Sequence, residues 1–82
     1  MSTDEILART ADIIRDTLQC GPLLIGRSTR AIDVRGWDSL SQTIIMLALE
    51  ENFGVQLPVD RSMCLKDVGE LVDLIVEMRA RC

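Results

Sequence analysis

The sequence predicts an all-α fold: a small bundle of three main helices plus one short helix, with a long loop between the first and second helices. Apolar residues recur at helical spacing in residues 4–19, 39–53 and 67–79. No segment alternates apolar and polar residues for long enough to form a strand. With 82 residues, 48% of them hydrophobic and 27% charged, the chain is expected to form a single globular domain over residues 1–82.

The first helix is expected to run from about Asp4 to Gln19. Thr3 is the predicted N-cap, because acidic residues follow it in the first turn. Gly21 and Pro22 are expected to end the helix, since proline cannot continue it. The predicted buried face comprises Ile6, Leu7, Ile13, Ile14 and Leu18.

Residues 20–38 form a long connection punctuated by glycine and proline. A disordered linker is not expected, because the connection carries several apolar residues that need burial. A loop of this length in a small domain is either functional or packed on the core, and both are expected here. The residues predicted to be buried are Leu23, Leu24, Ile25, Ile32 and Val34.

The second helix is predicted to begin near Ser39 and to end at Phe53, with Gly54 in a left-handed C-cap position. Ser39 and Gln42 match a capping box, with Ser39 as the N-cap. One apolar stripe is expected to face inward and comprises Ile45, Met46, Leu49 and Phe53. A second, rotated stripe exceeds what a small domain can cover, so Leu40, Ile44 and Leu47 are expected to stay partly exposed as a contact surface.

The chain then leads through Asp60 into a short helical segment that is expected to end near Cys64. The last helix is predicted to have Asp67 as its N-cap, Glu70 at the capping-box position and its end near Arg79. Its buried stripe is expected to comprise Val68, Leu71, Val72, Ile75 and Met78.

Composition excludes several classes of function. The chain has no histidine, which removes Ser-His and Cys-His nucleophile pairs and histidine metal sites. Its net charge of −4 argues against a nucleic-acid binder. The three cysteines, Cys20, Cys64 and Cys82, form no CxxC pair, and no apolar run approaches a membrane span. We therefore expect a cytoplasmic, non-catalytic protein with reduced thiols, in which Cys64 is a small core residue.

Ser39 lies at the junction between the long loop and a helix N-terminus. Unpaired backbone N–H groups and the positive end of the helix dipole favour an anion there, so a phosphate on Ser39 would be stabilised. Gly36 leaves room for an approaching enzyme or ligand, and Asp38 adds a carboxylate. By physical reasoning alone, the stronger interpretation is a plain N-cap, and attachment of an anionic group is the alternative.

Three segments of the chain together resemble the acyl carrier proteins. They are Gly-Trp-Asp-Ser-Leu at residues 36–40, Leu-Glu-Glu-Asn-Phe-Gly at residues 49–54, and the Val-Gly-Glu-Leu string within residues 65–75. The resemblance covers nearly the whole chain, including its length, the helix order and the long first loop. Asp-Ser-Leu alone is a weak match, but the three segments at this spacing are a strong one.

The resemblance implies that Ser39 is the attachment point for 4'-phosphopantetheine, transferred from coenzyme A by a phosphopantetheinyl transferase. The arm's thiol would carry an acyl thioester in fatty acid, polyketide or a related specialised biosynthesis. Ser39 would be modified and not catalytic. A loading ligase or acyltransferase and a downstream synthase are the other implied partners, and a monomer is expected. The implied docking residues are Asp38, Leu40, Ile44 and Leu47.

The chain departs from carriers of fatty acid synthesis in its charges. The first half of the second helix lacks acids, which return only at Glu50 and Glu51 and are interpreted as solvated charge. The first loop carries Arg27, Arg30 and Arg35, interpreted as solvated or partner-facing, with contacts to the arm's phosphate as the alternative. These differences favour a specialised stand-alone carrier.

Three questions stay open from the sequence. The single glycine before Trp37 favours acyl cargo over aminoacyl cargo only mildly, so an aminoacyl or peptidyl carrier is an alternative. A second alternative is an unmodified helical adaptor that binds a partner through the exposed apolar face of the second helix. Trp37 itself could contact the arm or a partner, or it could close the core beneath the loop.

Overall fold

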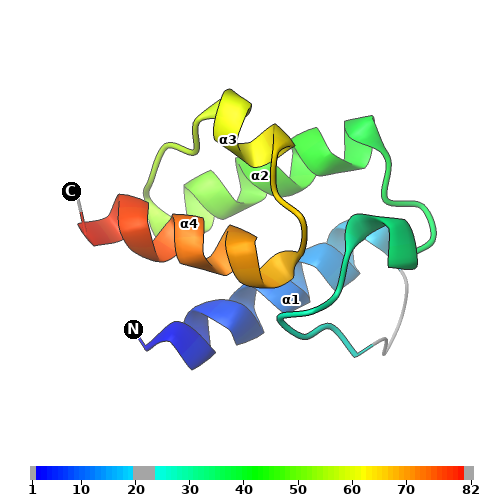
Figure 1. The fold of residues 1–82 in the computed structure, drawn as a ribbon, viewed down its shortest axis with the longest axis horizontal. Helices are drawn as coiled ribbons and strands as arrows, with labels where there is room; N and C mark the ends of the chain where they lie inside the picture. The colour runs from blue at the N-terminus through cyan, green and yellow to red at the C-terminus, as the bar shows by residue number, and fades with distance from the viewer. Residues whose placement is uncertain (1, 20–23, 81–82) are drawn as a thin grey trace.

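The computed structural model describes residues 2–19 and 24–80, and within these residues the chain is helical with no strand. Figure 1 shows the short helix of residues 59–63 beside the helix of residues 39–53, and the start of the first helix on the same side of the molecule as the end of the last. The predicted all-α architecture with a long first connection is confirmed. The elements are α1 (Thr3–Leu18), the 3-10 turn η1 (Ala31–Asp33), α2 (Ser39–Phe53), α3 (Val59–Met63) and α4 (Val68–Ala80).

A capping box starts α1, and its N-cap is Ser2, one residue before the predicted N-cap Thr3. The Ser2 hydroxyl accepts a hydrogen bond from the Glu5 N–H at 3.2 Å, and the Glu5 carboxylate accepts one from the Ser2 N–H at 3.2 Å. The prediction of Thr3 as the N-cap was therefore wrong. A capping box needs an acidic side chain three residues after the cap, and Glu5 stands at that distance from Ser2. Gln19, in a left-handed conformation, is the C-cap. The residues predicted to end this helix, Gly21 and Pro22, lie outside the described residues.

The core is aliphatic and is formed mainly by α1, α2 and α4, with α1 in contact with both of the others. The inward stripe predicted for α2 is confirmed: three of its residues are buried and Phe53 packs partly buried against them. In α4 four residues of the predicted stripe are buried, the fifth, Met78, is only partly buried, and Leu74 is buried in addition. The apolar side chains with the least exposure are Ile14, Ile45, Leu49, Val68, Val72 and Ile75.

The first connection is only partly buried. Ile25 and Val34 enter the core as predicted. Leu24 and Ile32 do not, with 90% and 84% of their surface exposed, so their predicted burial was wrong. Leu24 precedes Ile25 in an irregular stretch, where successive side chains point in different directions, and Ile32 lies on the solvent side of the single turn η1. Leu23 is outside the described residues.

The same connection is tied to the N-terminus of α4. The carbonyl of Thr29 accepts a hydrogen bond from the Val68 N–H at 2.8 Å, and the carbonyl of Arg27 accepts one from the Gly69 N–H at 2.7 Å. Two N–H groups that a helix cannot satisfy internally thus find partners in the loop. The Arg27 guanidinium also contacts both carboxylate oxygens of Asp73 at 3.0 Å. These contacts fix the path of the segment that leads towards α2.

At the start of α4, Asp67 acts as predicted, because its carboxylate accepts a hydrogen bond from the Glu70 N–H at 2.9 Å. The Glu70 carboxylate reaches back to the N–H of Lys66, at 3.1 Å, so the box is one residue wider than expected. An ion pair between Arg61 and Glu77 links α3 to α4. The segment between α2 and α4 is therefore held to α4 both through α3 and at its own end.

We expect Gly69→Ala to lower the free energy of unfolding by about 1–3 kcal/mol, the usual cost of overpacking. A Cβ at this position would lie 2.9 Å from the carbonyl oxygen of Arg27, so the loop must move and its hydrogen bonds to α4 weaken. Urea denaturation measures the loss. Gly26→Ala is the control, because its added methyl would meet no described atom within 4 Å. Equal stability of both variants would contradict this account of the loop.

Candidate functional site

The N-terminus of α2 is capped by Asp38. Its backbone is extended, with φ −114° and ψ −171°, and its carboxylate accepts a hydrogen bond from the Ser41 N–H at 2.9 Å. The prediction that Ser39 is the N-cap was therefore wrong, because Ser39 is already the first helical residue. The predicted box with Gln42 is absent as well, since the Gln42 amide is engaged elsewhere. The Ser39 hydroxyl is thereby released from a capping role.

The Ser39 side chain is exposed and makes no hydrogen bond to any residue that the structure describes. Its carbonyl, by contrast, accepts a hydrogen bond from the Thr43 hydroxyl at 3.1 Å within the helix. Gly36 lies just before it with φ +87°, a conformation that glycine adopts readily, and a Cβ there would meet nothing within 4 Å. The Ser41 hydroxyl donates to the Gly36 carbonyl at 3.0 Å and so holds this turn. An accessible hydroxyl at the first position of the helix is the result.

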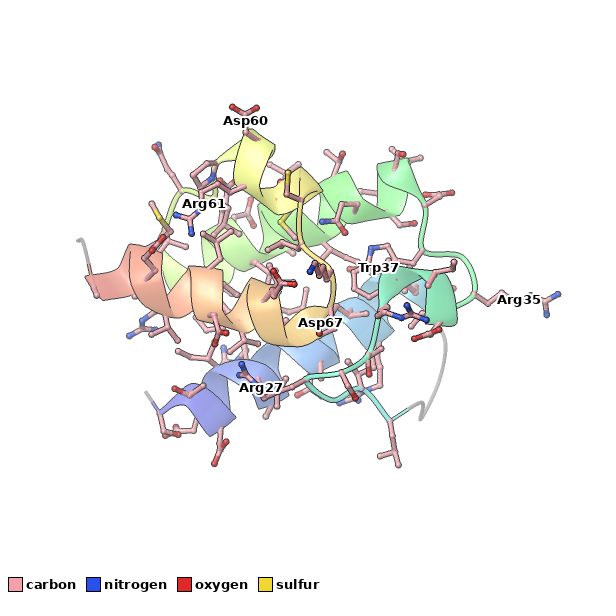
Figure 2. All side chains as sticks on the ribbon, viewed as in Figure 1. Arg27, Arg35, Trp37, Asp60, Arg61 and Asp67 are labelled. Atoms are coloured by element: carbon pink, nitrogen blue, oxygen red, sulfur yellow. The ribbon has the colours of Figure 1, made fainter. Side chains whose placement is uncertain are left out.

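Ser39 also lies on the rim of a cleft of about 520 Å³. The cleft is lined by residues of α2 such as Met46 and Leu47, by Ser62 of α3 and by residues of the first connection. Trp37 forms part of its lining and also packs, half-buried, against the core (Figure 2). The two interpretations of Trp37 are therefore compatible, because the indole packs against the core and also lines the cleft.

The second apolar stripe of α2 is exposed as predicted: Leu40, Ile44 and Leu47 keep 70%, 46% and 56% of their surface accessible. Ile45, Met46 and Leu49 on the opposite side are buried. This arrangement confirms the exposure, whereas the docking role of these three residues stays a prediction.

The charged residues differ in part from expectation. Glu50 is half-buried, and its carboxylate accepts a hydrogen bond from the Leu57 N–H at 2.8 Å, so its interpretation as solvated charge was wrong. The reason is that the chain turns back after α2 and brings the Leu57 N–H within hydrogen-bond distance of this side chain. Glu51 is exposed, as predicted. Cys64 is exposed and not a core residue, because it follows the last residue of α3 at the surface.

The three loop arginines have separate surroundings. Arg27 pairs with Asp73 of α4, and Arg30 pairs with Asp33 at 3.3 Å. Arg35 is exposed and extends away from the molecule (Figure 2). These positions do not form a common cluster beside the Ser39 hydroxyl. In the described residues there is no acidic or cysteine group arranged to hold a metal ion, and no helix there is long and apolar enough to cross a membrane.

Asp38 is expected to titrate at lower pH than an ordinary aspartate. The hydrogen bond from the Ser41 N–H lowers the pKa of its carboxyl group. A carboxyl whose pKa is lower in the folded state stabilises the protein above its unfolded pKa, and this stability is lost as pH falls through the folded pKa. NMR titration of the Asp38 carboxyl carbon tests the shift against a short peptide of the same sequence. We expect Asp38→Asn to flatten the acid side of the stability profile, and an unshifted titration would contradict the cap.

Comparison with known proteins gives consistent findings. A family model described as "Phosphopantetheine attachment site" matches residues 8–75. The acyl carrier protein of Caulobacter vibrioides (strain NA1000 / CB15N) is 32% identical over 76 residues, covering 93% of this chain and 97% of the relative. That of Acidothermus cellulolyticus is 36% identical over 75 residues, covering 92% and 89%. The solution NMR structure of the holo acyl carrier protein from Geobacter metallireducens superposes with a TM-score of 0.83 at 31% identity, covering 92% of this chain and 86% of that one.

The geometry at the start of α2 fits the group that this family model describes. A phosphopantetheine arm is joined through a phosphate, which needs an accessible hydroxyl and is stabilised by the N–H groups and dipole of a helix N-terminus. The exposed Ser39 hydroxyl meets both requirements, and the cleft beside it offers a surface for the rest of the arm. The chain belongs to the acyl carrier proteins, whose prosthetic group is 4'-phosphopantetheine.

Proposed function

We propose that this chain is one carrier domain, residues 1–82, that acts as a monomer and holds an acyl group as a thioester on an arm attached to Ser39. The observation that carries the proposal is the exposed Ser39 hydroxyl, which no described residue engages, at the capped N-terminus of α2. When bound, 4'-phosphopantetheine supplies a long arm whose terminal thiol forms the thioester. The cargo belongs to fatty acid, polyketide or a related specialised biosynthesis.

The attachment step uses few residues of this chain. A separate phosphopantetheinyl transferase binds coenzyme A and the start of α2. The Ser39 hydroxyl oxygen forms a bond to phosphorus, the bond from phosphorus to the nucleotide part of coenzyme A breaks, adenosine 3',5'-bisphosphate leaves, and the hydroxyl proton passes to a base of the transferase. Asp38 caps the helix in place of Ser39 and so keeps that oxygen available. Gly36 leaves the approach open.

The remaining chemistry belongs to partner enzymes. A loading ligase or an acyltransferase charges the arm, and a downstream synthase takes up the cargo. We assign the docking surface to the exposed residues Leu40, Ile44 and Leu47, with Asp38 at its end. Exposed apolar side chains that are grouped on one helix face are typical of contact surfaces.

Intact-mass analysis tests the carrier function. The purified apo chain is incubated with coenzyme A and a broad-specificity transferase, and we expect the mass to increase by one phosphopantetheine group. A chain that never gains this mass would be the unmodified adaptor considered above. Incubation of the modified chain with acyl-loading and aminoacyl-loading enzymes then separates acyl cargo from aminoacyl cargo.

Association with the native partner should depend only weakly on salt. Screening acts on exposed charges over about 8 Å at physiological ionic strength and leaves apolar contacts almost unchanged. The first half of α2 has no acid, and Glu50 and Glu51 lie near its far end. Ile44→Glu is expected to improve loading by fatty-acid-type enzymes with basic patches and to impair the native partner. A steep fall of native loading across a salt series would contradict apolar docking.

A further inference from the structure

The end of the molecule that carries Ser39 is built from two segments of the chain. Figure 1 shows the turn η1 and the start of α2 at this same end. Ala31 of η1 lines the same cleft as Ser39, so the two segments are neighbours. Next to Ala31, Ile32 keeps 84% of its surface exposed, and Arg35 extends outward from this end (Figure 2). An enzyme that reaches Ser39 therefore comes close to these two side chains as well as to α2.

The backbone that carries Ile32 and Arg35 is held in place by its neighbours. The Val34 N–H donates to the carbonyl of Ala31 at 3.1 Å, and the Trp37 N–H donates to the carbonyl of Val34 at 3.3 Å. Val34 is buried, and the Trp37 indole packs partly buried against the core. Ile32 and Arg35 alternate with these anchored residues. A partner that binds them therefore restricts little additional backbone freedom, which favours binding.

The unpaired charge at this end is a cation, although the chain as a whole has a net charge of −4. The other two arginines of the first connection already form ion pairs with carboxylates. Arg35 is exposed and forms no ion pair with any described residue. Asp38 is acidic, but its carboxylate accepts the Ser41 N–H and so offsets the positive end of the α2 dipole. The free guanidinium of Arg35 is thus placed to meet an acid outside the chain.

Exposed apolar residues concentrate around the same serine. Among the described residues, four of the five large apolar side chains that are exposed lie within eight positions of Ser39 in the sequence. Three of them form the α2 stripe, and the fourth is Ile32 on the first connection. Grouped apolar residues of this kind are typical of contact surfaces, and burial of Ile32 in an apolar hollow would be favourable.

We propose that the synthase that takes up the cargo binds the first connection together with α2, with an apolar hollow for Ile32 and an acidic side chain opposite Arg35. Its contact face is apolar with an acidic rim, the reverse of the basic patches that acid-rich carriers meet. This inference rests on the proposed attachment at Ser39 and names the kind of partner that this site serves. One exposed ion pair adds little salt dependence, so the weak dependence expected above is retained.

The test uses one ketosynthase in two forms, with the entrance to its active site surrounded by acidic residues in one and by lysines in the other. Excess transferase attaches an arm with an electrophilic end that reacts with the synthase's active-site cysteine, and intact mass verifies complete loading. The rate of crosslinking is then measured. We expect the wild type to react faster with the acidic form. Arg35→Glu should lower that rate about 10-fold and raise the rate with the lysine form about 2- to 5-fold.

Arg9→Glu is the matched control for this charge reversal. Arg9 is exposed on α1 and forms no ion pair with a described residue, and its replacement changes the net charge by the same amount. Both crosslinking rates should stay within about 2-fold of the wild type, because a contact pair depends on position and not on net charge. Equal effects of Arg9→Glu and Arg35→Glu would overturn the proposed ion pair.

Ile32→Ser tests the apolar part of the contact. The side chain is exposed, so the variant should fold, and we expect crosslinking to both synthase forms to slow about 10-fold. Wild-type rates in this variant would overturn the apolar hollow. A wild-type dimer in sedimentation that Ile32→Ser converts to a monomer would also overturn the proposal, since a second copy would then cover this surface. A chain that never gains the mass of the arm would instead overturn the attachment at Ser39, so the two failures are distinguishable.

Discussion

Replacing Ser39 with alanine is expected to abolish loading from coenzyme A completely while leaving the free energy of unfolding within about 0.5 kcal/mol of the wild type. Loading is lost because the hydroxyl oxygen is the proposed nucleophile. Stability is kept because Asp38, and not Ser39, caps α2, and because the Ser39 hydroxyl has no hydrogen bond to a described residue. Intact mass measures the first effect, and urea denaturation measures the second.

Ser41→Ala is the matched control for this experiment. Ser41 lies two residues further along the same helix turn, and its hydroxyl donates to the carbonyl of Gly36. Its backbone N–H, which binds Asp38, remains in the alanine variant. We therefore expect Ser41→Ala to accept the arm. An alanine variant at position 39 that still gains mass would show that the site is elsewhere.

Leu49→Ala is expected to lower the free energy of unfolding by about 2–5 kcal/mol, the usual cost of a large core truncation. Leu49 of α2 is fully buried in the core cluster. Ile44→Ser on the opposite face should change stability by no more than about 0.5 kcal/mol, yet slow transfer to the partner enzyme. Thermal denaturation and a transfer assay together distinguish the two faces. A large loss of stability in Ile44→Ser would place that residue in the core.

The helices and their inward faces could be predicted because they depend on local spacing. Apolar residues at helical intervals point to one side, and a chain of this size has only one core for them to enter. Gly54 ends α2 with φ +65°, as its type predicts. The same reasoning found the surplus apolar face of α2, since Leu40, Ile44 and Leu47 could not all be covered.

The caps and the loop contacts could not be predicted in this way. Both Asp38 and Ser39 are good N-cap residues, and only the backbone conformation decides between them. The contact of Arg27 with Asp73 joins residues far apart in the sequence, and no local pattern signals it. Glu50 was misinterpreted for the same reason, because its partner is a backbone N–H seven residues later.

The hydrogen bond between Trp37 and Gln42 illustrates this limit most clearly. Trp37 and Gln42 lie five residues apart, and the sequence suggested a capping role for Gln42. A capping glutamine and one that bridges two helices look alike in a sequence, since both are polar residues in the first turn. The distinction depends on the position of Ser62, which the long-range fold determines.

Fragmentation mass spectrometry of the loaded wild-type chain tests the central claim most directly. The modified protein is digested, and the phosphopantetheine mass is located on the fragment that carries it. We predict a single modified residue, Ser39. Modification of Ser28, Ser41 or Ser62, with Ser39 unmodified, would contradict the account, because none of these hydroxyls lies exposed at the first position of α2.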